Sequence, residues 1–228
     1  MSAGAAARDF GTGPLSRIIA LLYTLLAVQV SFALAAAPAV VLLLLLDRDV
    51  SNLPLAALCA LPLGPAASAA VWALHHRRAD LTDLRPAAAF WLAYKRNARG
   101  VLKLWAPWLA FTTVIAVNLA HFDAAGVPGW WAWLLVAVGA AAALWAANAL
   151  VITSLFAFRT TDVARLAAYF LLRTWPVTLG YASLLIVALG VIYLFSEAVL
   201  MLIAVLLLWS LAVVSRPMTA AITREFTA

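Results

Sequence analysis

The side chains that could do chemistry in this sequence of 228 residues are few, and the histidines come first among them. His75 and His76 could bind a metal ion together, because imidazole nitrogen is a common ligand of transition metals. Neighbouring residues on a helix point about 100° apart, however, and no third ligand lies near them in the sequence. We therefore expect this pair to lie at a membrane interface, beside Arg77 and Arg78, and to bind no metal.

Covalent catalysis and cofactor chemistry have no recognisable site. No nucleophile stands beside a base, no two carboxylates are paired, and no glycine-rich loop is suited to holding a phosphate. The single cysteine, Cys59, lies in an apolar run, which is typical of a small buried hydrophobic residue. The sequence predicts a protein that is not an enzyme and uses no cofactor. An intramembrane enzyme, the remotest alternative, would need an acidic partner for His75 or His121.

Neutral amides lie within the long apolar runs, at Gln29, Asn118 and Asn148. An ion-coupled carrier usually buries a carboxylate or a lysine near the membrane midplane, where an unpaired charge costs at least about 2.5 kcal/mol. Such residues are almost absent from these runs, which argues against a proton-coupled carrier. We expect each amide to join neighbouring helices by hydrogen bonds. Neutral sugars are also bound by amides and aromatic faces, so a solute site is the alternative.

Basic residues outnumber acidic ones, 15 to 9, and the net charge is +6. The densest basic cluster comprises Arg77, Arg78, Lys95, Arg96 and Arg99. Apolar runs separate the basic clusters, and no phosphate-binding backbone motif accompanies them, so we expect no nucleic-acid partner. The predicted partners are the lipid bilayer and its anionic headgroups.

Membrane-spanning helices must position these side chains. The sequence is 67% hydrophobic and 11% charged, with a mean hydropathy of +1.05, so it has too few charges to cover a soluble domain of this size. It predicts an all-α fold, a polytopic membrane helical bundle of six transmembrane helices with two short interfacial amphipathic helices. The spans lie at about 18–46, 53–74, 104–120, 130–157 and in the two halves of 177–214, which meet at Ser196 and Glu197. The interfacial helices lie at 84–100 and from Thr160 to Pro176.

A single membrane domain is expected at 15–216. It would lie between a disordered cytoplasmic tail at 1–14 and a second cytoplasmic tail at 217–228. A cleavable signal peptide is the alternative for the first span, because Ala33-Leu34-Ala35 is similar to a cleavage site. Cleavage there would leave a short apolar stub, so we favour a membrane anchor.

A parallel internal repeat is suggested between about 53–120 and 130–196. At an offset of 79 residues, Phe90 aligns with Tyr169 and Trp91 aligns with Phe170. Each copy would join an inward span, an interfacial helix and a returning span.

The charges predict the orientation of the chain. Six spans place both termini and the two long loops on one side, and 14 of the 15 cations then lie on that side, with Arg48 alone on the other. Lysine and arginine in short loops mark the cytoplasmic side. We therefore expect both termini to be cytoplasmic.

The second span contains a stripe of small residues. Gly64 and Ser68 are spaced four apart and lie on one helical face, which lets helix backbones approach closely. Pro62 and Pro65 bracket a predicted distortion, whose freed carbonyls need partners on neighbouring helices.

Several segments carry a family resemblance. They are LPLGPAASAAVWAL at 61–74, the aromatic and basic run from Phe90 to Asn97, Asn148-Ala149-Leu150, Phe158-Arg159 and Arg173-x-x-Pro176. Over about 18–216 the chain resembles the YesL family of bacterial integral membrane proteins, a family of unknown function. Members tend to be encoded near carbohydrate ABC transporters and polysaccharide-degrading enzymes. The resemblance implies a multi-pass protein of the bacterial cytoplasmic (inner) membrane with an accessory role in sugar uptake, and it transfers no catalytic residue.

Two hypotheses follow for the function. The first is an accessory or scaffold component associated with carbohydrate uptake, with a sugar ABC permease as a candidate membrane partner. The alternative is a small transporter or channel for a neutral solute such as a sugar. The candidate interaction residues are Gly64, Pro65, Ser68, Phe90, Tyr94, Lys95, Arg96, Asn97, Asn148 and Arg173.

Overall fold

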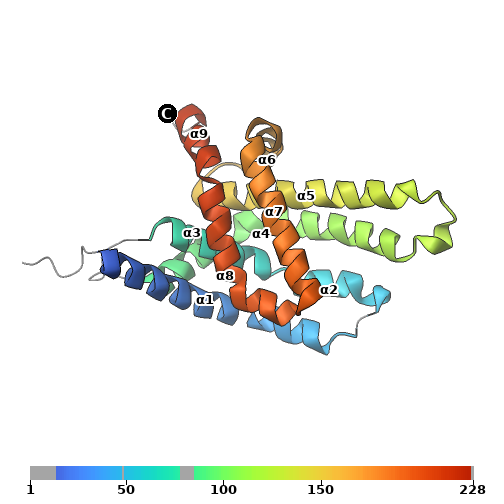
Figure 1. Ribbon diagram of the computed structural model, residues 1–228, viewed down its shortest axis with the longest axis horizontal. Coiled ribbons are helices and arrows are strands. Elements are labelled where there is room, and N and C mark those ends of the chain that lie inside the picture. The colour runs from blue at the N-terminus through green and yellow to red at the C-terminus, as the bar shows by residue number, and fades with distance from the viewer. Residues whose placement is uncertain (1–13, 48, 78–84, 227–228) are drawn as a thin grey trace, which may run out of the picture.

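The computed structural model describes residues 14–47, 49–77 and 85–226, and this part of the chain is helical with no strand (Figure 1). The elements, in chain order, are α1 (Pro14–Leu45), η1 (Val50–Asn52), α2 (Leu53–Cys59), α3 (Leu63–His75), α4 (Pro86–Ala120), η3 (Asp123–Ala125), α5 (Trp130–Leu155), α6 (Thr160–Arg173), α7 (Trp175–Leu194), α8 (Glu197–Val214) and α9 (Arg216–Phe226). The predicted all-α class is confirmed. The predicted tail at 1–14 falls almost entirely outside the described residues.

Five of the described helices are long and apolar enough to cross a membrane: α1, α4, α5, α7 and α8. A sixth span results if the short helices α2 and α3, which meet at a bend of 43°, are counted together. The chain is therefore compatible with a multi-pass membrane protein.

The bend between α2 and α3 lies at the predicted proline-rich distortion. Pro62 is the N-cap of α3 and has no N–H to donate, so the helical hydrogen-bond ladder is interrupted there. The Ala60 carbonyl at the break accepts a hydrogen bond of 3.2 Å from the indole N–H of Trp105 in α4. The predicted partner on a neighbouring helix is thus a tryptophan.

The predicted interfacial helix at 84–100 is wrong as a separate element. It is the first part of α4, which runs without a break from Pro86 to Ala120. Gly100 is the strongest helix breaker between the amphipathic and apolar parts, and one glycine costs only about 1 kcal/mol in a helix. A helix of 35 residues is about 52 Å long, far more than a hydrocarbon core of about 30 Å, so its basic first turns extend the span beyond the apolar layer.

The second interfacial helix is confirmed as a separate element, α6. It ends at Arg173, and Thr174 leaves the helical conformation before α7 begins at Trp175. Pro176 explains the break, because in a continuous helix it would have no N–H for the Leu172 carbonyl and its ring would clash with that carbonyl, whereas proline is tolerated in the first turn of a new helix. The predicted division of 177–214 into two helices is confirmed: they are α7 and α8, each long and apolar enough to cross a membrane, and Ser196 caps α8 by accepting from the Val199 N–H.

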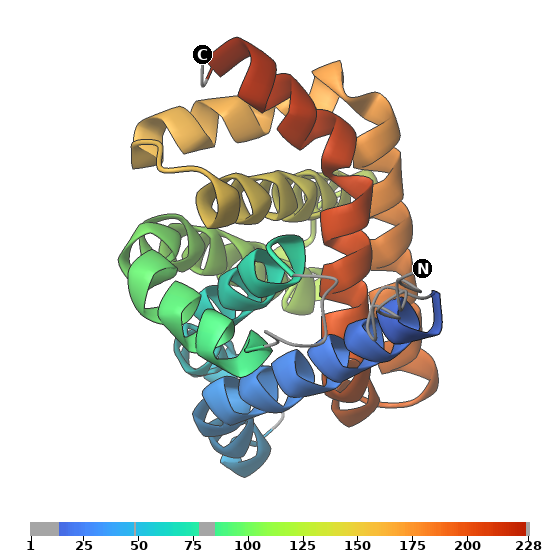
Figure 2. The same cartoon turned by 90° about the vertical axis from the view of Figure 1, so that its left-hand side faces the viewer.

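The segment treated above as a cytoplasmic tail at 217–228 is helical as far as Phe226. In α9, Met218 and Ile222 have no exposed surface and belong to the larger hydrophobic core. The helix itself was not predicted, because the segment is short and its apolar residues are spaced among polar ones. Figure 2 shows α6 and α9 lying across the end of the bundle.

The α3 helix lies at the centre of the fold. Nine of its thirteen residues are buried, and it contributes to both hydrophobic cores. Val71 belongs to the core formed with α4, α5, α6, α7, α8 and α9, whereas Ala66 and Ala69 belong to the core formed with α1, α4 and α8. Its small side chains allow helices to pack closely on several sides.

The residues aligned in the predicted repeat have opposite environments. Phe90 is fully buried whereas Tyr169 is 50% exposed, and Trp91 is 37% exposed whereas Phe170 is fully buried. An offset of 80 residues pairs Phe90 with Phe170, and both of these side chains are fully buried. The same offset pairs Val71 with Val151 and Val101 with Tyr181, all four of which are buried. The burial pattern favours this shifted alignment, and the repeat itself stays a prediction.

The two ends of the bundle differ in charge. In Figure 1 the start of α1, the end of α3 and the start of α4 lie at the left, while the connection from α4 to α5 lies at the right. The left-hand end carries Arg77 and Arg85, and α6 and α9, which lie beside it at the top, carry further arginines.

Candidate functional site

Three helices meet at a polar cluster inside the bundle. We call Ser68 of α3, Asn97 of α4 and Ser154 of α5 the serine–asparagine cluster. The Asn97 Nδ2 atom donates to the Ser68 Oγ atom and to the Ser154 carbonyl, each at 3.3 Å, and the two serine hydroxyls are hydrogen-bonded at 2.9 Å. Ser68 and Ser154 are buried, with exposures of 0% and 1%. The structure thus brings together two of the predicted site residues, Ser68 and Asn97.

The protons of this cluster can be assigned from its geometry. The Ser154 hydroxyl lies 2.6 Å from the Leu150 carbonyl, which can only accept, so its single proton points there. The Ser68 hydroxyl is then the donor between the two serines. A serine becomes a nucleophile when a neighbouring base takes its proton. The groups bonded to the serines here are an amide, hydroxyls and carbonyls, and the arrangement is suited to joining helices.

Arg96 extends from the cluster toward the basic end of the bundle. Its Nε atom lies 3.4 Å from the Asn97 Oδ1 atom, and its guanidinium lies 5.0 Å from the centre of the Trp72 ring. The other neighbour of Trp72 is His76, whose ring stacks on the indole at 4.3 Å and whose Nδ1 atom lies 3.0 Å from the Trp72 carbonyl. Trp72 is therefore held by an arginine and a histidine.

The other aromatic and basic candidates on α4 separate into core and surface. Phe90 is fully buried in the core shared with α1 and stacks on the partly buried Tyr94 at 6.3 Å. Lys95 is exposed. Phe90 is therefore a packing residue, and Lys95 is available to a partner.

Gly64 and Pro65 are both buried, at the start of α3. The Trp105 indole packs against the Gly64 backbone so closely that a Cβ atom on Gly64 would lie 2.5 Å from the Trp105 Cγ atom. This contact requires a glycine at position 64. The indole N–H of the same tryptophan donates to the Ala60 carbonyl at the bend between α2 and α3.

The predicted interhelical role of the amides is confirmed for two of the three. Asn148 of α5 donates from Nδ2 to the Ala167 carbonyl of α6 at 3.0 Å. Gln29 of α1 donates to the Met201 carbonyl of α8 at 2.8 Å and accepts from the Val205 N–H at 3.1 Å. The prediction is wrong for Asn118, which is exposed and donates to Val114 in its own helix, because it lies on an outward face near the end of α4.

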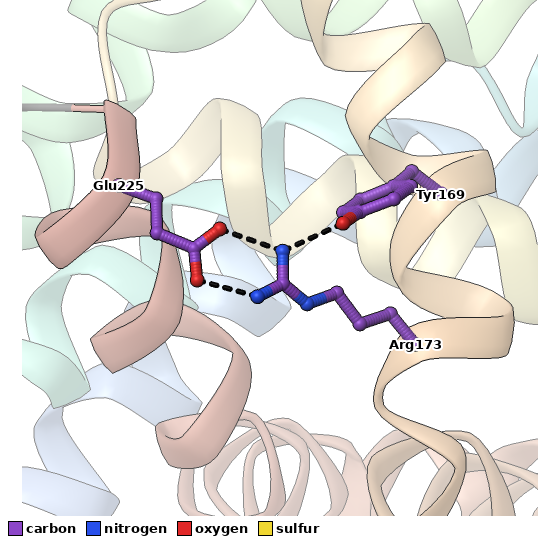
Figure 3. Close-up of polar contacts among 3 residues, drawn as sticks. All are labelled: Tyr169, Arg173 and Glu225. Atoms are coloured by element: carbon purple, nitrogen blue, oxygen red, sulfur yellow. Dashed lines mark hydrogen bonds and ion pairs between the residues drawn. The ribbon is translucent and has the colours of Figure 1, made fainter.

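Arg173 holds the C-terminal helix in place. Its guanidinium donates to both carboxylate oxygens of Glu225 in α9 at 2.6 Å, and also to the Tyr169 hydroxyl at 2.6 Å (Figure 3). The hydrogen bond with Glu225 raises the pKa of the Arg173 side chain. The partner residue, Glu225, lies in the segment predicted to be a cytoplasmic tail.

The histidines form no metal site in the part of the chain that the structure describes, where no three His, Cys, Asp or Glu side chains gather closely enough to hold an ion. The His75 and His76 rings meet edge to face at 5.1 Å. His121 lies 3.0 Å from the Val117 carbonyl through its Nδ1 atom.

Comparison of the chain with known protein families, with curated proteins and with solved structures gives no match. The resemblance to the YesL family therefore stays a prediction from the sequence.

Proposed function

We propose that this protein is a non-enzymatic scaffold of the bacterial inner membrane, associated with carbohydrate uptake. The observation that supports this proposal is that polar side chains inside the bundle form hydrogen bonds from one helix to another. Gln29 joins α1 to α8, the serine–asparagine cluster joins α3, α4 and α5, and Asn148 joins α5 to α6. A transport pathway needs polar groups that are free to bind a solute, whereas these groups bind neighbouring helices.

The proposed orientation has both termini in the cytoplasm. The basic end of the bundle and the arginines of α6 and α9 would then face the cytoplasm, in agreement with the rule that lysine and arginine mark the inner side. Fusion of a reporter active only in the periplasm tests this: activity from a fusion at Gly126 and none from a C-terminal fusion supports the orientation. The opposite pattern would overturn it.

The proposed partner is a sugar permease, and this part of the proposal rests on the family resemblance. The exposed face of α4 next to the cluster offers Leu92, which is 60% exposed, and the cations Lys95 and Arg99. Such a face can bind both the apolar flank and the acidic residues of another membrane protein.

In-cell photo-cross-linking tests the partner. A photoreactive residue at Lys95 should capture a permease subunit, identified by mass spectrometry. The same residue at Tyr193, which is 88% exposed on α7 near the opposite end, is the control and should not capture it. Equal capture from both positions, or capture of lipid alone from Lys95, would contradict a permease partner at this face.

The alternative, a transporter for a neutral solute, has specific observations in its favour. The α2–α3 pair is a bent helix of the kind that forms substrate sites in transporters. In the described part of the chain, the Asn148 Oδ1 atom and the Tyr181 hydroxyl are buried without a hydrogen-bond partner. Liposomes containing the purified protein should take up labelled sugar if this alternative holds, and Asn148→Ala should slow the uptake. Absence of uptake under any gradient would exclude it.

A further inference from the structure

A cleft of about 310 Å³ lies at the basic end of the bundle, where α1, the end of α3 and the start of α4 meet. Thr24, Trp72 and Pro86 form part of its wall, and small apolar side chains form much of the rest. Its volume is at the lower end of the range of ligand sites, about 300–1,000 Å³. The cleft is therefore large enough for a small polar group.

The charges that line this cleft are positive. Arg77, just after α3, and Arg85, just before α4, both contribute to the lining, and none of the described lining residues is acidic. Asp80 and Asp83 lie between the two arginines in the sequence and outside the described residues. Arginine presents several N–H donors in a planar fork, which matches the oxygens of a phosphate.

The start of α4 adds to this positive potential. Pro86 is the first residue of the helix, and Arg85 is its N-cap, whose own side chain makes no capping hydrogen bond. The first helical hydrogen bond is from the Ala89 N–H to the Arg85 carbonyl, so the helix leaves the N–H groups of Ala87 and Ala88 without a partner within it. Ala88 lines the cleft. Free N–H groups at a helix start favour an anion.

The wall of the cleft is rigid on the α3 side. The Trp72 ring lies 5.0 Å from the Arg96 guanidinium and stacks on the His76 ring at 4.3 Å. Arg96 is not among the lining residues, so its charge holds the indole while Arg77 and Arg85 stay available. The buried Thr24 hydroxyl donates to the Ala20 carbonyl, which leaves its oxygen as an acceptor in the cleft wall. A ligand hydroxyl is the natural donor to that oxygen.

From these contacts we infer that the cleft binds a phosphate group that carries a neighbouring hydroxyl. This chemistry occurs in the headgroup of an anionic phospholipid such as phosphatidylglycerol and in a soluble phosphate ester such as glycerol phosphate. The arginines and the α4 N–H groups would bind the phosphate oxygens, and the Thr24 oxygen would accept from the hydroxyl. The site is separate from the serine–asparagine cluster, and it shares only Leu92 with the residues named for the proposed permease-binding face.

Calorimetry on the full chain in a neutral detergent tests this site. The probes are short-chain phosphatidylglycerol, short-chain phosphatidylcholine and glycerol phosphate. Wild-type protein should bind phosphatidylglycerol and discriminate against phosphatidylcholine, whose headgroup carries a compensating cation and no hydroxyl. Binding of glycerol phosphate with comparable affinity would identify a soluble ester as the ligand, and its absence would identify the lipid. Binding of neither phosphatidylglycerol nor glycerol phosphate would overturn the inference.

The variants locate the binding. Arg77→Ala and Arg85→Ala should each weaken binding about tenfold, because each removes a charge-assisted hydrogen bond. Arg77→Lys with Arg85→Lys should keep part of the affinity. The matched control is Lys95→Ala with Arg99→Ala, which removes the same charge from exposed positions outside the cleft lining. Thermal unfolding confirms that each variant is folded. The inference fails if the folded Arg77→Ala and Arg85→Ala double variant binds like wild type, or if the control loses as much affinity.

Discussion

The indole of Trp105 in α4 lies against the bare backbone of Gly64 at the start of α3, and its N–H bonds the Ala60 carbonyl just before. One side chain thus fills the space left by a glycine and donates a hydrogen bond to a carbonyl at the bend beside Pro62. The bend in the predicted second span and the close approach of α3 and α4 are therefore one structural feature.

Replacement of Gly64 by alanine should destabilise the protein. The three heavy atoms nearest to the new Cβ, at 2.5 to 2.7 Å, all belong to the Trp105 indole, which must move and weaken its bond to Ala60. Overpacking of this kind costs about 1–3 kcal/mol. Thermal unfolding in mild detergent should show a lower midpoint for Gly64→Ala.

The matched control for this substitution is Gly100→Ala, in the interior of α4. Its Cβ would lie 3.5 Å from the Thr153 Cγ2 atom, an ordinary contact, and alanine favours a helix over glycine by about 1 kcal/mol. We expect the control to be neutral or stabilising. Equal destabilisation by both substitutions would show that the Trp105 contact is not the cause.

Much of the fold could be predicted because hydropathy and proline positions are local signals. The ends of α6, the turn at Ser196 and the break near Pro62 all follow from residues within a few positions of the feature. The continuity of α4 could not be predicted so simply, because an abrupt change from a charged to an apolar surface was interpreted as the end of a helix. One continuous helix can pass from a polar to an apolar environment with no break in its backbone hydrogen bonds.

Removal of the Asn97 side-chain amide should loosen the serine–asparagine cluster. Asn97→Ala removes the donor to Ser68 and to Ser154, at a cost of about 1 kcal/mol, the usual size of such bonds between membrane helices. Asn118→Ala, which affects a bond within one exposed helix, should change stability by less than about 0.5 kcal/mol. A double-mutant cycle of Asn97→Ala with Ser68→Ala should give a coupling energy of at least about 0.5 kcal/mol. Additive effects would contradict the direct contact.

Gln29 bridges two backbone groups of α8 that one helical turn could pair with each other, the Val205 N–H and the Met201 carbonyl. Gln29→Leu should therefore cost little, about 1 kcal/mol or less, because these groups can bond directly. Gln29→Glu should cost more, since an ionised carboxylate cannot donate to Met201. Acidification protonates the carboxylate and restores a donor, so this variant should gain stability as the pH falls. Unfolding midpoints measured across the acidic range, with wild type alongside, test the sign.

The candidate site was predicted in part, and the missing members share a physical cause. Ser68 and Asn97 were identified, but their partner Ser154 looks in the sequence like any small polar residue of an apolar helix. Glu225 and Trp105 were missed likewise, because the contacts that give them a role join positions 52 and 45 residues apart. Which residues pair across helices depends on the crossing angle and register of the helices. The periodicity of the sequence within one helix gives no information about either.

The ion pair of Arg173 with Glu225 should strengthen the docking of α9, which the burial of Met218 and Ile222 also supports. Both side chains are partly exposed, 39% and 35%, so salt should weaken the pair. Glu225 raises the pKa of Arg173 above its ordinary value, and the arginine contribution is lost only as the pH rises through that raised pKa, so docking should not depend on Arg173 titration near neutral pH.

Charge reversal tests this pair. Arg173→Glu should place two carboxylates together and expose α9 to thermolysin at the Ala221–Ile222 bond, which is buried in the docked helix, whereas Arg173→Glu combined with Glu225→Arg should restore protection. Arg165→Glu reverses an exposed charge on the same helix and should leave cleavage unchanged. Met218 and Ile222 are buried in the core and still favour docking in the Arg173→Glu variant. Cleavage of this variant should therefore be faster than that of wild type but slower than that of the unfolded protein. Failure of the double reversal to restore protection would show that burial of α9, without the ion pair, determines its position.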